Sequence, residues 1–353
     1  MTAASSRPRP ATASADPSEY FERVRQQGMG PLWKAMGDLM PTTPKPREVP
    51  YQWRWADIRD LVYESAKVVR VEDAVRRVLM LLNPGLPPEQ AAVTQTLYAG
   101  IQIILPGEVA PAHRHTPNAL RFVMEGEGAF TTVEGEKTIL RKGDVVTTPN
   151  WTWHDHGNES KGPVVWLDAL DIPLVNALSG MFYEDYPQKT HPVRDAENSS
   201  QRTYGRALRP TGETRASNYS PILNYTYASA REALESMPST AWSPTEGRVI
   251  EYINPLTGGP ILPTMDAFLQ QVDPGMDLKA CRQSASRIVM GVEGEGTLEV
   301  EDQRFRWKPF DVMVVPAWAK HRVVPTGRTP AVLFSYTNAP VMRALSLYRE
   351  TVL

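Results

Sequence analysis

The sequence predicts an all-β protein built from two β-barrels, with helices before and between them. Residues 98–170 and 261–336 consist of short apolar or alternating runs separated by glycine-containing turns, a pattern typical of an antiparallel sandwich or barrel. The two blocks also look like copies of each other, because the letters EGEG at 125–128 recur at 293–296. A repeat of this kind indicates two homologous barrels in one chain.

A second match strengthens the repeat. GDVVTTPNWTWH at 143–154 aligns with FDVMVVPAWAKH at 310–321, so that aspartate, proline, tryptophan and histidine coincide. The shift between the copies is 168 residues at the first match and 167 at the second, which one deletion explains. We therefore expect the second barrel to repeat the strand order of the first.

Composition excludes several classes of protein. The 353 residues are 41% hydrophobic with a net charge of -2, so no basic surface points to nucleic acid or to an anionic membrane. No apolar run approaches the roughly 20 residues that span a bilayer. The single cysteine, Cys281, excludes an intramolecular disulfide framework and fits a reducing cytoplasm. Any metal must therefore be held by nitrogen and oxygen ligands.

The first 90 residues are expected to hold helices and the first strands. Residues 1–16 contain prolines and lack an apolar core, which indicates a disordered tail, with a transit peptide as the alternative. Helical spacing of apolar residues covers 17–40 and 55–69. The stretch 71–81 begins as a helix and continues into a strand closed by a Pro-Gly turn. We assign 17–90 to this N-terminal region.

The remaining chain divides into two barrels and a linker. We assign 91–190 to the first barrel, 191–255 to a polar, proline-containing linker and 256–353 to the second barrel. One helix is expected in the linker at 229–237, and another at 340–350 after the last strand.

Two histidine pairs in the first barrel predict a metal site. His113 and His115 lie two residues apart, so on a strand they point to the same face. His154 and His156 form a second such pair, and either could complete a three-histidine site. Neutral imidazoles suit iron, zinc, copper, nickel or manganese, and the ligand type alone does not choose among these metals.

The repeat predicts that only the first barrel binds metal. His113 aligns with Cys281 and His115 with Gln283, so the second copy keeps only His321. One imidazole without partners is a poor metal site. We expect the second barrel to be structural or to serve as an assembly surface.

The histidines lie in segments that resemble the two signature motifs of the cupin superfamily. The first runs from Gly107 through His113 and His115, and the second from Gly143 through Pro149, His154 and Asn158. The resemblance implies a bicupin of two jelly-roll (double-stranded β-helix) barrels, with His154 as the third ligand and His156 beside it, non-ligating. The sequence departs from the motifs where Ala119 and Leu120 replace the usual glutamate ligand and Trp151 replaces a glycine.

A bicupin with three histidines in its first barrel and a degenerate second barrel resembles the gentisate 1,2-dioxygenase family. Salicylate and 1-hydroxy-2-naphthoate dioxygenases are relatives within it. The resemblance implies one Fe(II) per chain, held in the first, catalytic barrel. It also implies a cytoplasmic homotetramer that inserts both atoms of O2 between the carboxyl-bearing and hydroxyl-bearing carbons of gentisate, giving maleylpyruvate.

The same resemblance suggests residues for an aromatic hydroxy-acid substrate. Its carboxylate needs a cation in a low-dielectric barrel, and Arg121 and Arg77 match the family's pocket arginines, with a surface salt bridge as the alternative for each. Tyr98 and Gln102 match further pocket positions, Tyr98 as in the gentisate enzymes.

Two residues are expected to take part in catalysis. His156 is expected to orient a ring hydroxyl or to move a proton, with a backbone-bonded structural histidine as the alternative. Asp168 lies in an apolar strand, where a bare carboxylate is costly. We expect it to pair with His156 or with a substrate hydroxyl, and a buried structural partner is the alternative.

Two other functions remain open from the sequence. The substrate is salicylate or 1-hydroxy-2-naphthoate in the first alternative. In the second, the protein is a cupin that binds a ligand without turnover. Oxygen consumption separates the second alternative from the enzymes.

Overall fold

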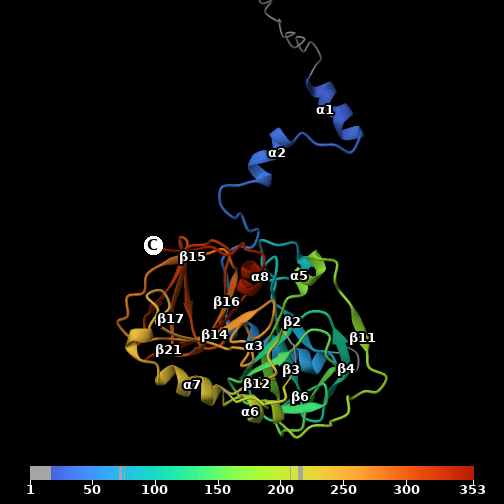
Figure 1. Cartoon of the computed structure of the whole chain (residues 1–353), viewed down its shortest axis with the longest axis vertical. Helices are drawn as coiled ribbons and strands as arrows, with labels where there is room; N and C mark the ends of the chain where they lie inside the picture. Colours follow the sequence, from blue (N-terminus) through green and yellow to red (C-terminus); the bar gives the residue numbers. More distant parts are fainter. Residues whose placement is uncertain (1–16, 71–73, 75, 207, 214–217) are drawn as a thin grey trace, which may run out of the picture. The chain divides into compact units, whose positions relative to one another are not determined.

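The computed structural model describes residues 17–70, 74, 76–206, 208–213 and 218–353 (Figure 1). The chain forms two compact units, 1–45 and 46–353. No helix in the described part is long and apolar enough to cross a bilayer. The predicted disordered tail, residues 1–16, lies outside the described residues.

The first unit confirms the predicted helical region but divides it. It contains α1 (Pro17–Gln26) and α2 (Leu32–Leu39). The helices are separate because Gly28 adopts a φ of +67° and because Pro31, which precedes α2, lacks the N–H that a continuous helix needs.

The second unit holds two barrels, each made of a six-stranded and a five-stranded antiparallel sheet. In the first barrel the six-stranded order is β12 (Asn224–Tyr225), β8 (Val145–Thr148), β5 (Ala119–Glu125), β10 (Val164–Leu170), β3 (Tyr98–Ile104) and β2 (Val78–Met80). Its five-stranded order is β11 (Tyr183–Asp185), β4 (Val109–His115), β9 (His154–Asn158), β6 (Ala129–Val133) and β7 (Glu136–Ile139).

The second barrel has the same arrangement. Its six-stranded order is β1 (Tyr51–Trp53), β19 (Val312–Val315), β16 (Arg287–Glu293), β21 (Ala331–Thr337), β14 (Asp266–Val272) and β13 (Arg248–Glu251). Its five-stranded order is β18 (Gln303–Trp307), β17 (Gly296–Val300), β20 (His321–Pro325), β15 (Cys281–Gln283) and β22 (Glu350–Val352). The predicted all-β fold with two repeated barrels is confirmed.

Helices connect these strands. They are α3 (Trp55–Val68), η1 (Pro88–Gln90), α5 (Ile172–Ala177), α6 (Ser199–Tyr204), α7 (Tyr227–Glu235), η2 (Ser239–Ala241) and α8 (Ala339–Ala344). In the chain order, α3 takes the place in the first repeat that α7 takes in the second, and α5 takes the place of α8.

Helix predictions succeeded in part. Helices α3 and α7 form where expected, whereas α5 and α6 are not predicted from the sequence. The helix expected at 340–350 is shorter, because Ser346 adopts a φ of +58° and the chain then pairs as β22 with β15. The strand expected within 71–81 is confirmed as β2, but most of its predicted helical beginning lies outside the described residues.

The first strand of each repeat pairs with the other repeat's barrel. β1 precedes the first barrel but pairs with β19 of the second, with Tyr51 opposite Val314. β12 precedes the second barrel but pairs with β8 of the first, with Asn224 opposite Val146. Because the exchange is reciprocal, neither barrel's six-stranded sheet is complete without the other half of the chain.

The main core lies between the two six-stranded sheets. Alternation along β5 sends Leu120, Phe122 and Met124 away from their own barrel, into one apolar cluster that includes Phe334 of β21. The rings of Phe122 and Phe334 lie 4.7 Å apart between centroids. Arg121, which lies between Leu120 and Phe122 in the sequence, points into its own barrel and is also buried. The inter-barrel core therefore leaves the barrel interiors available for polar side chains.

Truncating the inter-barrel core should destabilise the protein. A buried phenylalanine replaced by alanine costs about 3–5 kcal/mol of unfolding free energy, so we expect Phe122→Ala to lower the denaturant midpoint measured by tryptophan fluorescence. Leu178→Ala, at a side chain that is 73% exposed, should change the unfolding free energy by no more than about 0.5 kcal/mol. Equal midpoints for the two variants would contradict a shared inter-barrel core.

Candidate metal centre

Three histidines from two neighbouring strands meet inside the first barrel. His113 and His115 lie on β4, and His154 begins β9, where it pairs opposite His113. One ring nitrogen of each lies within 4.8 Å of those of the other two, and all three side chains are buried. Within the described residues this is the one cluster of metal-ligating type. His156, the other candidate third ligand, is not part of it.

Backbone carbonyls orient each ring. The Nδ1 atoms of His113, His115 and His154 lie 2.9 Å from the carbonyl oxygens of Pro111, Pro117 and Thr152, respectively. A carbonyl can only accept, so each Nδ1 carries the hydrogen and each Nε2 keeps its lone pair. The Nε2 atoms of His115 and His154 are buried and have no partner among the described residues. This is the arrangement that metal-ligating histidines adopt.

The cluster is electrically neutral. Burial, with Arg76 nearby, lowers the pKa of His113 to about 2 and that of His115 to about 3. Burial also holds the pKa of His154 well below its ordinary value. Neutral imidazoles are the form that coordinates a metal ion, and they would leave a bound divalent cation with its full charge.

A buried arginine contacts this cluster, and it is Arg76 rather than the adjacent Arg77 that the sequence suggested. Arg77 forms an ion pair with Glu108 and donates to the carbonyl of Val69 at 3.2 Å. Arg76 instead has Nη2 3.3 Å from Nδ1 of His113. The two adjacent arginines therefore have different partners, and of the two it is Arg76 that contacts the histidine cluster.

Arg76 keeps hydrogen-bonding capacity for a ligand. The Nδ1 of His113 donates to Pro111, so it cannot also accept from Arg76. The Nε of Arg76 is buried with no partner among the described residues. Burial and the nearby Arg121 lower the pKa of Arg76 to about 9, which leaves it cationic at neutral pH. An anion beside the histidines would be stabilised by this charge.

Arg121 is fully buried on β5, but its partner differs from the expected one. We expected Asp168 to pair with His156 or a substrate hydroxyl. Asp168 instead lies opposite Arg121 in the sheet, with Oδ1 3.0 Å from the arginine Nε, and it also accepts from Trp166 Nε1 at 3.1 Å. Arg121 also donates to Thr148 at 2.6 Å. The expectation that Asp168 pairs with His156 is therefore wrong, because the sheet register brings Arg121 to it.

The remaining expected residues also lie in the first barrel. His156 has its Nδ1 2.8 Å from the hydroxyl of Thr131, and its Nε2 is buried without a partner among the described residues. Gln102 on β3 is buried, and its Oε1 likewise has no partner there. Tyr98, at the start of β3, is buried, and Arg76 and Asp168 both act on its pKa. These groups can accept or donate hydrogen bonds to a small molecule.

Sequence reasoning missed two side chains at the histidines. Arg76 is one, and Tyr183 on β11 is the other, with its ring stacked on His113 at 5.2 Å between centroids. The adjacency of Arg76 to Arg77 was the available signal for the first. Tyr183 lies 70 residues from His113, and the pairing of β11 with β4 that joins them is a tertiary contact.

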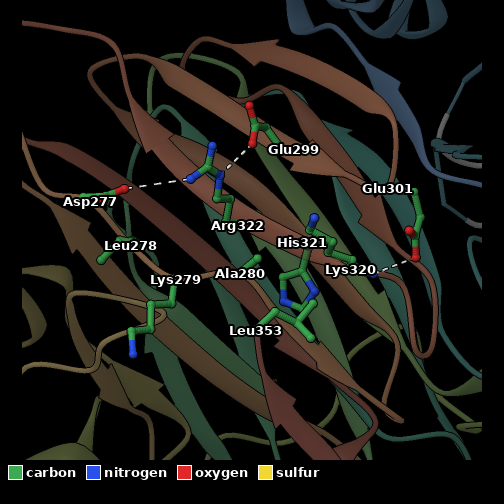
Figure 2. Close-up of a pocket in the computed structure, with 10 residues that line it drawn as sticks. All are labelled: Asp277, Leu278, Lys279, Ala280, Glu299, Glu301, Lys320, His321, Arg322 and Leu353. Atoms are coloured by element: carbon green, nitrogen blue, oxygen red, sulfur yellow. Dashed lines mark hydrogen bonds and ion pairs between the residues drawn. The ribbon is translucent and has the colours of Figure 1, made fainter.

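The second barrel lacks this arrangement. His321 has Cys281 Sγ 3.5 Å from its Nε2, and burial raises the pKa of that thiol to about 11, so the sulfur stays protonated. A cleft of about 410 Å³ lies beside His321. Among the residues that line it, Arg322 forms ion pairs with Glu299 and Asp277 (Figure 2). The described residues of this barrel hold no second histidine cluster.

Comparisons with known proteins agree with this picture. Residues 100–170 and 268–337 each match the Cupin domain family. The chain is 37% identical to gentisate 1,2 dioxygenase 1 of Aquipseudomonas alcaligenes, over 94% of this chain and 95% of the relative. It is 36% identical to a 1-hydroxy-2-naphthoate 1,2-dioxygenase of Nocardioides sp. strain KP7, over 97% and 89%.

A solved structure shows the same architecture. The salicylate 1,2-dioxygenase of Pseudoaminobacter salicylatoxidans, determined with gentisate, is 32% identical with a TM-score of 0.89, over 97% of this chain and 96% of that one. The histidine cluster, the two cupin barrels and these relatives lead to one conclusion: the chain belongs to the family of gentisate and salicylate 1,2-dioxygenases, ring-cleaving enzymes of the bicupin fold.

Proposed function

We propose that the protein is an Fe(II)-dependent gentisate 1,2-dioxygenase that forms maleylpyruvate. The observation that carries the proposal is a neutral three-histidine cluster, with two buried Nε2 atoms that have no partner among the described residues, close to the buried Arg76 and Arg121. A cluster without a carboxylate ligand leaves a bound divalent cation with its full charge, which an anionic substrate can neutralise. A 2-hydroxybenzoate supplies the negative charge, together with two oxygen atoms placed to chelate.

His113, His115 and His154 would hold the iron through their Nε2 atoms. The two buried, unpartnered Nε2 atoms support this, because each is costly unless something accepts its lone pair. When bound there, Fe(II) would supply Lewis-acid activation of the substrate and a site for dioxygen. The carbonyls behind the rings hold the three lone pairs in a fixed direction.

Arg121 and Arg76 would bind the substrate carboxylate. Both guanidinium groups are buried, where a charge-assisted hydrogen bond is stronger than in water. Oδ1 of Asp168 lies 3.0 Å from Nε of Arg121, and this ion pair restricts the conformations of the arginine side chain. Asp168 would thus orient the cation, and it would also contact a hydroxyl group of the substrate.

His156, Gln102 and Tyr98 would contact the ring and its hydroxyl groups. His156 presents a free Nε2, and Thr131 fixes its ring through Nδ1. Burial, Arg121 and Arg76 hold the pKa of His156 well below its ordinary value, so a neutral imidazole faces the substrate. Such a group can orient a hydroxyl or accept its proton.

A second candidate is oxidation of salicylate or 1-hydroxy-2-naphthoate. It is supported by relatives whose names carry those substrates at identities close to that of the gentisate enzyme. Tyr98 favours gentisate, because a phenol at the pocket can hydrogen-bond the second ring hydroxyl that salicylate lacks. A cupin that binds these acids without turnover is the remaining alternative.

Removing a ligand should remove the metal. We expect His154→Ala to retain less than about a tenth of the wild-type iron, because two imidazoles hold a divalent ion poorly. Metal analysis of purified protein measures this, with His321→Ala as the control that keeps one iron per chain. Full iron retention in the His154→Ala protein would move the ligand assignment to His156. A second iron per chain in the wild type would contradict the degenerate second barrel.

Oxygen uptake should identify the substrate. We expect kcat/KM for gentisate to exceed that for salicylate and 1-hydroxy-2-naphthoate by about tenfold or more, the value of one good hydrogen bond. An oxygen electrode measures all three in the iron-loaded enzyme. A preference for either of the other two acids would reject gentisate as the substrate, and anaerobic binding without any oxygen uptake would indicate a binding protein.

Loss of Arg121 should weaken substrate binding. Arg121→Gln alone leaves Asp168 buried and unpaired, so the informative variant is Arg121→Gln/Asp168→Asn, which removes both charges. We expect kcat/KM to fall about 100-fold, the equivalent of about 2.7 kcal/mol. Arg121→Lys keeps the charge and should fall less. Steady-state kinetics at constant iron content measures this, and wild-type kinetics in the double variant would exclude Arg121 from the substrate.

A further inference from the structure

The repeated acidic residues of the sequence hold two equivalent helices. The Asp311 carboxylate of the second barrel accepts the backbone N–H of Trp55, the first residue of α3, at 2.7 Å. The Asp144 carboxylate of the first barrel accepts the backbone N–H of Tyr227, the first residue of α7, at 3.0 Å. Each helix therefore begins on the barrel of the other repeat, and the negative charge lies at its positive end.

A second carboxylate holds each helix from the other side. Glu125, in the first EGEG, accepts from Trp55 Nε1 and Arg59 at 3.0 Å and from the Tyr63 hydroxyl at 2.7 Å. All three donors lie on one face of α3, four residues apart. Burial raises the pKa of Glu125, but these donors outweigh it and hold the pKa below its ordinary value. We name these four residues the α3 clasp.

The second EGEG builds a matching clasp on α7. Glu293 accepts from the Tyr227 hydroxyl at 2.5 Å and lies 3.7 Å from Arg231, which stands four residues after Tyr227 as Arg59 stands four after Trp55. The two clasps occupy equivalent places in the repeat. They differ in the contacts made by the segments that follow the two helices.

The residues that follow α3 connect it to the arginine beside the histidine cluster. The helix ends at Val68, and the carbonyl of Val69 accepts from Arg77. The carbonyl of Arg77 in turn accepts from the backbone N–H of Ile103 on β3 at 3.3 Å. Arg76 therefore lies directly beside a residue that is bonded both to the end of α3 and to the barrel, which links the position of the helix to that of the Arg76 backbone.

The segment that follows α7 carries no free cation like Arg76 among its described residues. It carries Glu246, which forms a buried ion pair with Arg287 of β16. Arg287 stands in the register where the first barrel has Ala119, because Ala119 pairs opposite Thr148 and Arg287 opposite Val315. The segment after α3 thus places the cationic Arg76 beside the histidine cluster. The equivalent segment after α7 instead contributes Glu246 to an ion pair with Arg287.

We propose that Glu125 is a positioning residue, which aligns Arg76 with the substrate carboxylate by clasping α3. The inference rests on the proposed function, in which Arg76 binds that carboxylate. Misplacing a charged group by about 1 Å weakens binding strongly. Glu125 touches neither the histidines nor Arg76 in the described structure, so its effect on the substrate passes through the helix.

The test compares Glu125→Gln with Glu293→Gln in the iron-loaded enzyme. Each substitution weakens one clasp, and both should lower thermal stability. We expect Glu125→Gln to raise KM for gentisate about 5- to 20-fold, with kcat and iron content within about twofold of wild type. Glu293→Gln should leave KM within about twofold. Equal KM for the two variants would overturn the proposal.

A double-mutant cycle shows whether the effect passes through Arg76. In an Arg76→Gln background, which itself should raise KM, we expect Glu125→Gln to add less than about twofold. Independent, multiplicative effects of the two substitutions would overturn the proposal even if Glu125→Gln alone raised KM. A wild-type enzyme that turns over none of the three acids would overturn the proposed function itself, whereas turnover with the wrong KM pattern would overturn only the positioning role.

Discussion

The face-to-face packing of the two six-stranded sheets is the constraint on which the rest of the structure depends. Successive side chains of a strand point to opposite faces of the sheet. For every apolar residue of β5 that packs against the second barrel, the next residue in the sequence therefore points into the interior of the first barrel. Leu120 and Phe122 occupy the inter-barrel core, and Arg121 between them is forced inward. A buried guanidinium is costly, and the apolar area between the barrels is what offsets it.

The two barrels show what this constraint permits. Register places Val289 where the first barrel has Arg121, and Ser335 where it has Asp168. Val323 likewise stands in the place of His156. Val289 and Val323 belong to an apolar cluster of the second barrel, while the same places in the first barrel hold Arg121 and His156, and the Nε2 of His156 has no partner among the described residues.

Electrostatics in the first barrel follows from burial more than from any pair of charges. Burial lowers the pKa values of the histidines and of Arg76, so the interior of the first barrel holds neutral imidazoles beside cationic guanidinium groups. In the described structure Asp168 is the carboxylate that pairs with Arg121. Under the proposed function, these charges would favour an anionic ligand over a neutral phenol, because a neutral ligand would leave Arg76 without a counter-charge.

The sequence by itself determined the repeat, the all-β class and the histidines, because turns, two-residue alternation and motif spacing are local signals. It placed His113 and His115 on one face of a strand, and the resemblance to cupins supplied His154. Only the tertiary structure decided that Arg76 rather than Arg77 meets the histidines and that Asp168 pairs with Arg121. Those choices depend on strand register and on contacts between residues far apart in the chain, which no local pattern encodes.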